Sequence, residues 1–299
     1  MNQQFLTELK AVTAENRIFT DEPMKKHTTF RVGGPADILV QPKGTELAAV
    51  IRLCRKYDVP YQVIGNGSNL LVGDRGIRGL VIEMLSKEDE ICVEDDCITV
   101  GAGMLLSKTA NRAAEHGLTG MEFAAGIPGS IGGAVVMNAG AYGGEMKDIL
   151  TAVTVLDQEG NEKILSAEEL ELGYRTSCIL KKGYIVTGAK IKLKHGEETA
   201  IRARMEELKK QRVEKQPLEY PSAGSVFKRP EGAFAGALIE QCGLKGKTVG
   251  GAQVSEKHAG FIINKSKATA DDVKQLVSEI QKTVENETGY KLECELIFL

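Results

Sequence analysis

The placement of glycine constrains this chain more than any other feature of its sequence. The 299 residues include 33 glycines, which gather at 65–80, 101–103, 126–144 and 243–251. Glycine adopts backbone conformations with φ > 0 and lets another backbone or a ligand come close. Loops of this kind carry binding and catalytic residues more often than the elements that they connect. The four clusters therefore indicate where the chain binds a ligand.

Between these clusters, the spacing of apolar residues predicts a protein that mixes helices and strands. We expect helices at 46–57, 105–116, 201–213, 233–243 and 270–286. We expect strands at 59–64, 98–100, 152–157, 184–193, 258–264 and 290–299. The composition becomes strongly charged along the helix near residue 206, where we place a boundary. The predicted domains are 1–90, 91–205 and 206–299.

Composition and charge argue against several classes of protein. The 38 Lys and Arg residues are balanced by 41 Asp and Glu residues, so there is no basic field to hold nucleic acid. No stretch approaches the roughly 20 apolar residues of a membrane span, and no secretory leader is recognisable, so we expect a cytoplasmic protein. The six cysteines form no CxxC pair and the four histidines are isolated. We therefore expect buried, reduced cysteines and no metal site.

The first glycine-rich loop is expected between two short strands, within residues 63–72. Its residues combine backbone freedom with polar side chains: Gly65, Asn66, Gly67, Ser68 and Asn69. Exposed N–H groups in such a loop form a concave site for a pyrophosphate. The alternative is an ordinary hairpin turn, because Asn-Gly alone favours one.

The second loop, at 126–134, combines a rigid turn with a predicted short helix. Pro128 restricts the turn, and Ser130 is a suitable N-cap residue, so that free N–H groups would point at an anion. Gly132 and Gly133 each cost about 1 kcal/mol relative to alanine inside a helix. Another backbone or a flat ring packed against them would explain that cost. Tight packing between helices alone is the alternative.

Two further segments hold candidate chemistry. Arg175 presents a planar guanidinium that suits a carboxylate or phosphate. Ser225 follows Gly224 and precedes Lys228, so a hydroxyl is expected at a turn with an ammonium nearby. No Gly-x-Ser-x-Gly elbow surrounds this serine, which disfavours a hydrolase. The sequence contains neither a complete dinucleotide fingerprint nor a P-loop.

Seven segments, in this order, resemble the UDP-N-acetylenolpyruvoylglucosamine reductase (MurB) family. They are HTTFRVGGPAD (27–37), GNGSNLL (65–71), GMEFAAGIPG (120–129), NAGAYG (138–143), YRTS (174–177), AGSVFK (223–228) and GGAQVSEKHAGFIIN (250–264). The resemblance implies an α+β fold. Its FAD-binding region would have two subdomains of the vanillyl-alcohol-oxidase-like (PCMH) type, followed by a C-terminal α/β substrate domain. The chain is similar to the shorter type of the family, which lacks a tyrosine-bearing insertion.

The resemblance also implies an activity. NADPH would reduce noncovalent FAD, and the flavin would reduce UDP-N-acetylglucosamine enolpyruvate to UDP-N-acetylmuramate in peptidoglycan precursor synthesis. The implied cofactor-binding residues are Gly65, Asn66, Gly67, Ser68, Asn69, Ile127, Gly129, Ser130 and Gly133. The implied substrate-binding residues are Tyr174, Lys215, Gly224 and Lys228, and the implied catalytic residues are Arg175, Ser225 and Glu295.

Three alternatives remain open from the sequence. Glu293 lies two residues before Glu295, on the same face of the expected strand, and competes with it as the catalytic carboxylate. The chain could instead be another FAD oxidoreductase on the same scaffold, acting on a sugar or an alcohol. It could also be a nucleotide-binding module without catalysis. The sequence does not give the oligomeric state.

Overall fold

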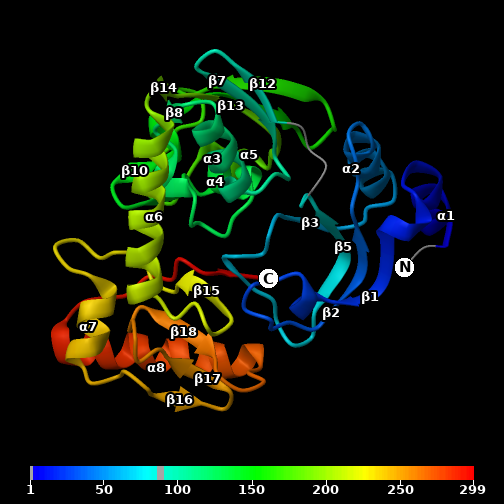
Figure 1. The fold of residues 1–299 in the computed structure, drawn as a ribbon. Helices are drawn as coiled ribbons and strands as arrows, with labels where there is room; N and C mark the ends of the chain where they lie inside the picture. The colour runs from blue at the N-terminus through cyan, green and yellow to red at the C-terminus, as the bar shows by residue number, and fades with distance from the viewer. Residues whose placement is uncertain (1–2, 86–90) are drawn as a thin grey trace. The chain divides into compact units, whose positions relative to one another are not determined.

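A computed structural model describes residues 3–85 and 91–299 (Figure 1). The chain divides into two compact units. The large unit comprises residues 1–20, 38–66 and 79–211, and the C-terminal unit comprises residues 21–37, 67–78 and 212–299. Three separate stretches of sequence thus build each unit. The division into three domains expected from the sequence stays a prediction.

The first half of the large unit surrounds a sheet with the order β1-β2-β5-β3. Its elements are α1 (Gln3–Val12), β1 (Ile18–Pro23), β2 (Pro35–Val40), α2 (Glu46–Lys56), β3 (Tyr61–Ile64) and β5 (Ile77–Glu83), with a 3₁₀ turn at Glu15–Arg17. β3 and β5 run parallel, with Tyr61 opposite Leu80. Phe5, Val50 and Ile82 are fully buried in the core of this half. The apolar stripe of α2 supplies much of that core, as its period predicts.

The second half of the large unit is built on an antiparallel sheet with the order β12-β11-β13-β7-β6. Its strands are β6 (Ile91–Glu94), β7 (Cys97–Gly101), β11 (Leu150–Leu156), β12 (Glu162–Ser166) and β13 (Ile185–Lys192). Its helices are α3 (Leu106–Glu115), α4 (Ile131–Val136) and α5 (Cys178–Lys182). The shorter elements are β8 (Leu118–Thr119), β9 (Gly140–Ala141), β10 (Gly144–Glu145), β14 (Lys194–His195) and 3₁₀ turns at Glu122–Ala124 and Met146–Asp148. Ile98, Leu106 and Val153 are buried in its core.

The C-terminal unit contains a sheet with the order β15-β18-β17-β16. Its elements are β15 (Ser222–Ser225), α7 (Ala235–Gln241), β16 (Thr248–Val249), β17 (Ala252–Val254), β18 (Phe261–Asn264) and α8 (Ala270–Thr288). β4 (Leu70–Leu71) pairs in parallel with β19 (Ile297–Phe298), and a 3₁₀ turn spans Met24–Lys26. Thr269 caps α8 reciprocally with Asp272, and Gly289 ends the helix at φ +77°. These caps satisfy backbone groups that the ends of a helix leave unpaired.

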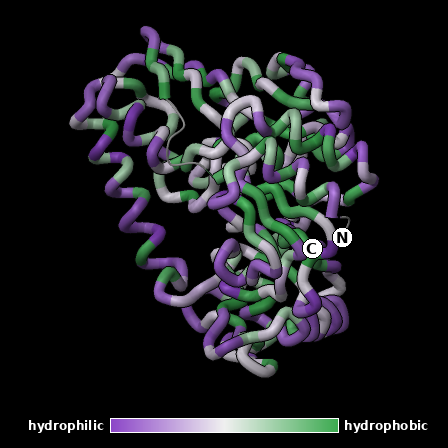
Figure 2. The backbone as a smooth tube through the Cα atoms, turned by 90° about the vertical axis from the view of Figure 1, so that its right-hand side faces the viewer, coloured by the Kyte–Doolittle hydropathy of each residue, from purple (hydrophilic) through white to green (hydrophobic). Residues whose placement is uncertain are grey.

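α6 (Glu198–Lys215) carries the charged segment and is mostly hydrophilic along its length (Figure 2). An i,i+4 ion pair joins Arg202 to Glu198 at 2.6 Å, and such pairs support an exposed helix. The chain passes for the last time from the large unit to the C-terminal unit between residues 211 and 212, inside this helix. No helix in the described ranges is both long and apolar enough to cross a membrane.

The five predicted helices are confirmed within a few residues at each end, but the predicted strand 290–299 is wrong for most of its length. Only Ile297–Phe298 form a ladder, and Cys294 makes an isolated bridge to Phe227. Leu292 and Leu296 are nevertheless buried. The alternation of apolar residues therefore predicts correctly which side chains of this segment are buried. It does not predict whether the segment pairs with a neighbouring strand.

The expectation of buried cysteines holds for some of the six residues. Cys54 and Cys178 are buried, and burial raises the pKa of the Cys54 thiol to about 12. Cys97, Cys242 and Cys294 are partly exposed. Cys92 is exposed, and these four residues correct the prediction. Cys92 lies on β6, an edge strand of the five-stranded sheet, and its side chain is on the solvent side of the alternating pattern.

Asp157 organises the turn between β11 and β12, and its replacement tests the pH dependence of stability. Its Oδ1 accepts hydrogen bonds from the N–H groups of Asn161 (2.9 Å) and Glu159 (3.0 Å), and Lys163 Nζ lies 3.1 Å from Oδ2. The backbone hydrogen bond from Asn161 is the main cause that lowers its pKa to about 2.

We expect Asp157→Asn to lower the urea midpoint at about pH 7 and about pH 5 by similar amounts. The carboxylate stabilises the fold above its unfolded pKa of about 3.8 and loses that effect as the pH falls toward the folded value. The gap between wild type and variant should therefore narrow near pH 3. An unchanged gap at that pH would contradict this assignment.

Candidate functional site

Two glycine-rich loops of the large unit approach each other closely. β3 ends at Ile64, and a Cβ atom on the next residue, Gly65, would lie 2.1 Å from Ser130 Oγ. Asn66 Nδ2 donates a hydrogen bond of 2.7 Å to the carbonyl of Pro128. The absence of a side chain at position 65 therefore leaves room for the Ser130 hydroxyl, and the Asn66 amide fixes this approach.

The first of these loops is not a hairpin turn. β3 pairs in parallel with β5, whereas β4 pairs in parallel with β19. The strands on either side of the loop therefore have different partners. The hairpin interpretation of the Asn-Gly pair is wrong, because a hairpin joins two strands that pair with each other.

The second loop is anchored by its backbone and by the predicted N-cap. Ser130 Oγ accepts a hydrogen bond of 3.4 Å from the Gly133 N–H, and Ser130 is only 2% exposed. The carbonyl of Gly129 accepts a hydrogen bond from the Leu106 N–H at 3.0 Å. Ile127 packs against the core of the five-stranded sheet. These protein contacts hold the loop in shape.

Several backbone donors of these loops have no acceptor within the described part of the chain. They are the N–H groups of Gly65, Asn66, Gly129 and Ser130. Backbone donors without a protein acceptor in a loop of this kind suit an anionic group such as a pyrophosphate. The donor set of the large unit therefore fits a dinucleotide cofactor.

The two glycines of α4 serve different purposes. A Cβ atom on Gly132 would lie 3.1 Å from Ala102 Cβ, so close packing within the protein explains this glycine. A Cβ atom on Gly133 would meet only Ser130 Oγ, at 3.5 Å, which is an ordinary contact. Nothing in the described protein therefore requires glycine at position 133, which is exposed. This leaves room there for a bound group.

The C-terminal unit contains the rest of the first loop. Gly67 has φ +60°, and a Cβ atom there would lie 2.1 Å from the carbonyl oxygen of His27. Asn69 Nδ2 donates a hydrogen bond of 3.0 Å to the Glu295 carbonyl. The Asn69 side chain thus holds the C-terminal segment in place. Contacts of Gly67, Ser68 and Asn69 with a cofactor stay a prediction.

Arg175 lies in a strained turn of the large unit. The backbones of Gly173 and Thr176 close this turn with hydrogen bonds of 3.1 and 3.3 Å. Arg175 has φ +54°, which residues other than glycine rarely adopt. Its guanidinium donates a hydrogen bond of 3.3 Å to the Gly140 carbonyl and lies 5.3 Å from the Tyr174 ring. Backbone strain of this kind concentrates at functional sites.

A bulge in β15 positions Ser225 within the C-terminal unit. The pairing register shifts between Ser222 and Ser225, and Gly224 between them has φ +78°. A bulge with glycine in the left-handed conformation re-aims the side chains that follow it. The Ser225 hydroxyl donates a weak hydrogen bond of 3.4 Å to the Phe227 carbonyl, and it can exchange this partner for another.

Both candidate glutamates lie beside the segment that follows Ser225. The Glu295 N–H donates a hydrogen bond of 2.8 Å to the carbonyl of Val226, the residue that follows Ser225. The Glu293 carboxylate lies 3.3 Å from Lys228 Nζ, and its side chain is 75% exposed. The assignment of Glu295 as the catalytic carboxylate stays a prediction. Lys215 is exposed at the end of α6.

His258 is a neighbour of Ser225 that the sequence did not reveal. A single Cβ atom built on Gly260 would lie 3.0 Å from His258 Cε1 and 3.3 Å from Ser225 Oγ, so both side chains lie beside Gly260. His258 Nδ1 accepts a hydrogen bond from the Gly260 N–H at 3.1 Å, and burial lowers the pKa of the imidazole. In this arrangement the Ser225 hydroxyl donates to the Phe227 carbonyl and His258 Nδ1 accepts from the Gly260 N–H, so these two groups are each bonded to other partners.

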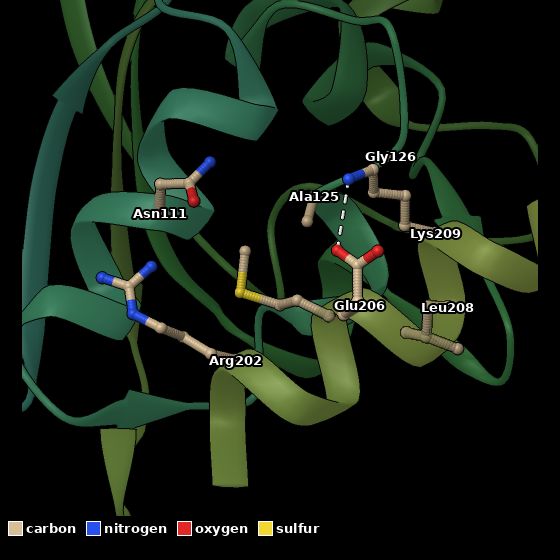
Figure 3. Close-up of a pocket in the computed structure, with 8 residues that line it drawn as sticks. Asn111, Ala125, Gly126, Arg202, Glu206, Leu208 and Lys209 are labelled. Carbon is tan, nitrogen blue, oxygen red and sulfur yellow. Dashed lines mark hydrogen bonds and ion pairs between the residues drawn. The ribbon is translucent and has the colours of Figure 1, made fainter. Parts of the chain in front are cut away.

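A pocket of about 460 Å³ lies beside the second glycine-rich loop (Figure 3). It is lined by residues of α3, of the loop and of α6: Asn111, Ala125, Gly126, Arg202, Met205, Glu206, Leu208 and Lys209. Glu206 points toward Gly126, whereas Arg202 extends toward the side of Asn111. None of the predicted catalytic residues lines this pocket. Within the described ranges, no group of three or more His, Cys, Asp or Glu residues could hold a metal.

The fold and the loops define the class of this protein. Residues 36–166 match the FAD binding domain family. About two thirds of the chain also superimposes on an alkyldihydroxyacetonephosphate synthase, with 17% identity, 41% coverage of that chain and a TM-score of 0.51, a similarity that concerns the fold alone. The protein is an FAD-binding oxidoreductase with an FAD-binding region of the PCMH type, as the sequence predicts.

Further comparisons identify the family. Residues 216–299 match the C-terminal domain of UDP-N-acetylenolpyruvoylglucosamine reductase. The enzyme of that name from Agathobacter rectalis is 52% identical over 99% of this chain and 98% of its own length. The crystal structure of the Thermus caldophilus enzyme superimposes with a TM-score of 0.80 and 42% identity, covering 92% of this chain and 97% of that one. The chain belongs to the UDP-N-acetylenolpyruvoylglucosamine reductase family.

Replacement of Gly133 tests whether the flavin uses the space at α4. We expect Gly133→Leu to fold normally, because leucine favours the helix, the position is exposed and a Cβ atom there makes only an ordinary contact with Ser130 Oγ. The purified variant should contain much less FAD than wild type, measured by the flavin absorbance per protein after gel filtration.

Lys108→Leu is a matched control, since it places leucine at another exposed helical position of the large unit. It should retain its FAD. Full flavin content in Gly133→Leu would exclude position 133 from the cofactor site.

Proposed function

We propose that this protein reduces UDP-N-acetylglucosamine enolpyruvate to UDP-N-acetylmuramate, with NADPH as the hydride donor and noncovalent FAD as the cofactor. The observation that carries the proposal is 52% identity to a reductase of this kind along almost the whole chain. The backbone donors of the two glycine-rich loops in the large unit support the cofactor. Arg175, Ser225 and Glu295 support the reduction step.

The cofactor is proposed to bind mainly through backbone groups. The N–H groups of Gly65, Asn66, Gly129 and Ser130 would hold the pyrophosphate, with Ile127 beside them and the open face of Gly133 next to the bound group. Bound FAD would supply a two-electron carrier that takes a hydride from NADPH and gives it to the enolpyruvyl methylene carbon. No Cys or His occurs in either loop, so no side chain there offers an obvious covalent attachment.

The substrate carboxylate determines what the chain's own residues must do. Addition of a hydride at the methylene carbon moves an electron pair toward the carboxylate, which then needs positive charge and hydrogen-bond donors. Arg175 would bind this carboxylate through its planar fork, and a protonated Glu295 would donate a hydrogen bond. Tyr174, Lys215, Gly224 and Lys228 would contact the remainder of the substrate.

Ser225 would complete the reaction by protonating the carbon next to the carboxylate. A hydroxyl is a weak acid, but the carbon that receives its proton is strongly basic. The hydroxyl donates a long hydrogen bond of 3.4 Å to the Phe227 carbonyl, so a small rotation can redirect it. Lys228 follows within three residues and would stabilise the resulting negative charge.

The proposed reaction is tested with the two half-reactions separately. Under anaerobic conditions, NADPH should bleach the flavin of the purified protein, and UDP-N-acetylglucosamine enolpyruvate should restore the oxidised spectrum with formation of UDP-N-acetylmuramate. If the reduced protein reacts with oxygen and ignores the enolpyruvyl compound, it is an oxidase on the same scaffold. A protein that NADPH does not reduce, although it holds FAD, would contradict the proposed donor.

Replacement of Ser225 tests the division of roles. We expect Ser225→Ala to leave flavin reduction by NADPH near the wild-type rate and to slow reoxidation by the enolpyruvyl substrate by about 100-fold or more, because only the second half-reaction needs the proton. Ser225→Cys should recover part of the rate, since a thiol still donates a proton. Rapid-mixing absorbance of the flavin measures both steps.

Replacement of Arg175 provides a comparison in the same assay. Arg175→Lys keeps the positive charge but loses the planar fork, so it should bind the carboxylate worse than charge alone would predict.

If Ser225→Ala slows both half-reactions alike, Ser225 is a structural turn residue. If it slows neither, another group is the proton donor.

A further inference from the structure

We infer that Asn138 is a positioning residue that holds Arg175 in its working geometry. This inference rests on the function proposed above, because Arg175 is the residue that it would position. Asn138 is fully buried in the large unit, at 0% exposure. A buried polar side chain costs free energy unless its hydrogen-bonding groups are satisfied, so its partners show what it holds together.

The Asn138 amide connects two segments that are far apart in sequence. Its Nδ2 donates hydrogen bonds to Glu145 Oε2 at 2.7 Å and to the Gly173 carbonyl at 3.0 Å. Its Oδ1 accepts a hydrogen bond of 2.9 Å from the Lys147 N–H. Both amide hydrogens and one lone pair of the oxygen are therefore used.

This amide acts on the turn that carries Arg175. Gly173, which receives the Asn138 hydrogen bond, is the residue that closes the turn with Thr176. Arg175 itself donates to the Gly140 carbonyl, two residues beyond Asn138. The segment that begins at Asn138 therefore contacts both the base of the turn and the guanidinium at its tip.

A second contact fixes the other end of the turn. Ser177, which is 1% exposed, donates a hydrogen bond of 2.8 Å from its hydroxyl to the Val136 carbonyl. With both ends of the turn fixed, Arg175 keeps the unfavourable φ of +54°. Without the amide of Asn138, the Gly173 end is released and the backbone of Arg175 can relax toward negative φ.

Asparagine suits this position better than the residues of similar size. The backbone there has φ +42°, which asparagine tolerates better than most residues. Aspartate has the same shape but would place a carboxylate oxygen against the Glu145 carboxylate and the Gly173 carbonyl, which are both acceptors. A protonated aspartate, in contrast, can donate one hydrogen bond again.

The experiment uses two variants of the full-length, FAD-loaded protein and one control. Asn138→Gly removes the side chain and accommodates the positive φ, so it should fold. Asn138→Asp keeps the shape and removes the donor. Asn161→Ala, the control, removes an amide from the β11–β12 turn that binds Asp157 and no part of the Arg175 turn.

We expect Asn138→Gly to keep its FAD and its rate of flavin reduction by NADPH, and to slow reoxidation by the enolpyruvyl substrate by about 100-fold, since a misplacement of about 1 Å can cost that much. Asn138→Asp should be slow at neutral pH and regain rate as the pH is lowered, relative to wild type. In the Asn138→Gly/Arg175→Lys double variant, the two losses should not add fully, because both act through the same group. Asn161→Ala should match wild type in both half-reactions.

The inference is overturned if Asn138→Gly slows both half-reactions alike or neither, or if its effect adds fully to that of Arg175→Lys. If wild-type reduced protein is not reoxidised by the enolpyruvyl compound, the proposed function fails, and the role of Asn138 is decided by hydrogen exchange. Amide exchange in residues 173–177 should then be faster in Asn138→Gly than in wild type. Unchanged exchange there would exclude the positioning role.

Discussion

The large unit depends on the close approach of Gly65–Asn66 and Pro128–Ser130. Gly65 follows β3, which packs in the core of the four-stranded sheet, whereas Ser130 begins α4 in the core of the five-stranded sheet. The 2.7 Å hydrogen bond from Asn66 to the Pro128 carbonyl therefore connects the two halves, which also meet where Leu156 and Ile185 of the five-stranded sheet pack in the core of the four-stranded sheet. Because Gly65 has no side chain, the connection brings free backbone donors of both halves together. The cofactor site that we propose would therefore lie where these halves join.

The same physical principle recurs at the predicted catalytic residues. Arg175 and Ser225 each lie beside backbone that only a few residues can adopt, φ +54° at Arg175 itself and φ +78° at Gly224. At Arg175, hydrogen bonds between the backbones of Gly173 and Thr176 close the turn. A strained backbone that is well supported gives a side chain a defined direction, which a flexible loop does not. Asn138 and Asn69 are part of this support, because their amides bind main-chain carbonyls next to the predicted catalytic residues.

The sequence predicted the loops better than the contacts between them. Glycine and Ser130 have local backbone preferences, so the sequence alone predicts the positions of the loops and the N-cap. The partner of Asn66 is the carbonyl of Pro128, which has no signature in the sequence. The burial of Asn138 was hidden for the same reason, since two of its three partners are backbone groups, of Lys147 and of the distant Gly173, and the third is the Glu145 carboxylate. Alternation in residues 290–299 showed burial correctly, but ladder pairing depends on neighbours that the pattern cannot reveal.

The C-terminal unit contains a strand pair whose members are more than 200 residues apart in the sequence, β4 (Leu70–Leu71) and β19 (Ile297–Phe298). β19 is hydrogen-bonded to β4, and the Gly73 N–H donates to the carbonyl of Leu299 at 2.8 Å. During synthesis, β4 emerges early and must remain without this partner until the ribosome has added β19. Contacts of such large sequence separation slow folding and prolong the exposure of unpaired edges. Residues 67–78, which include part of the first glycine-rich loop, would therefore be among the last parts of the protein to reach their final structure.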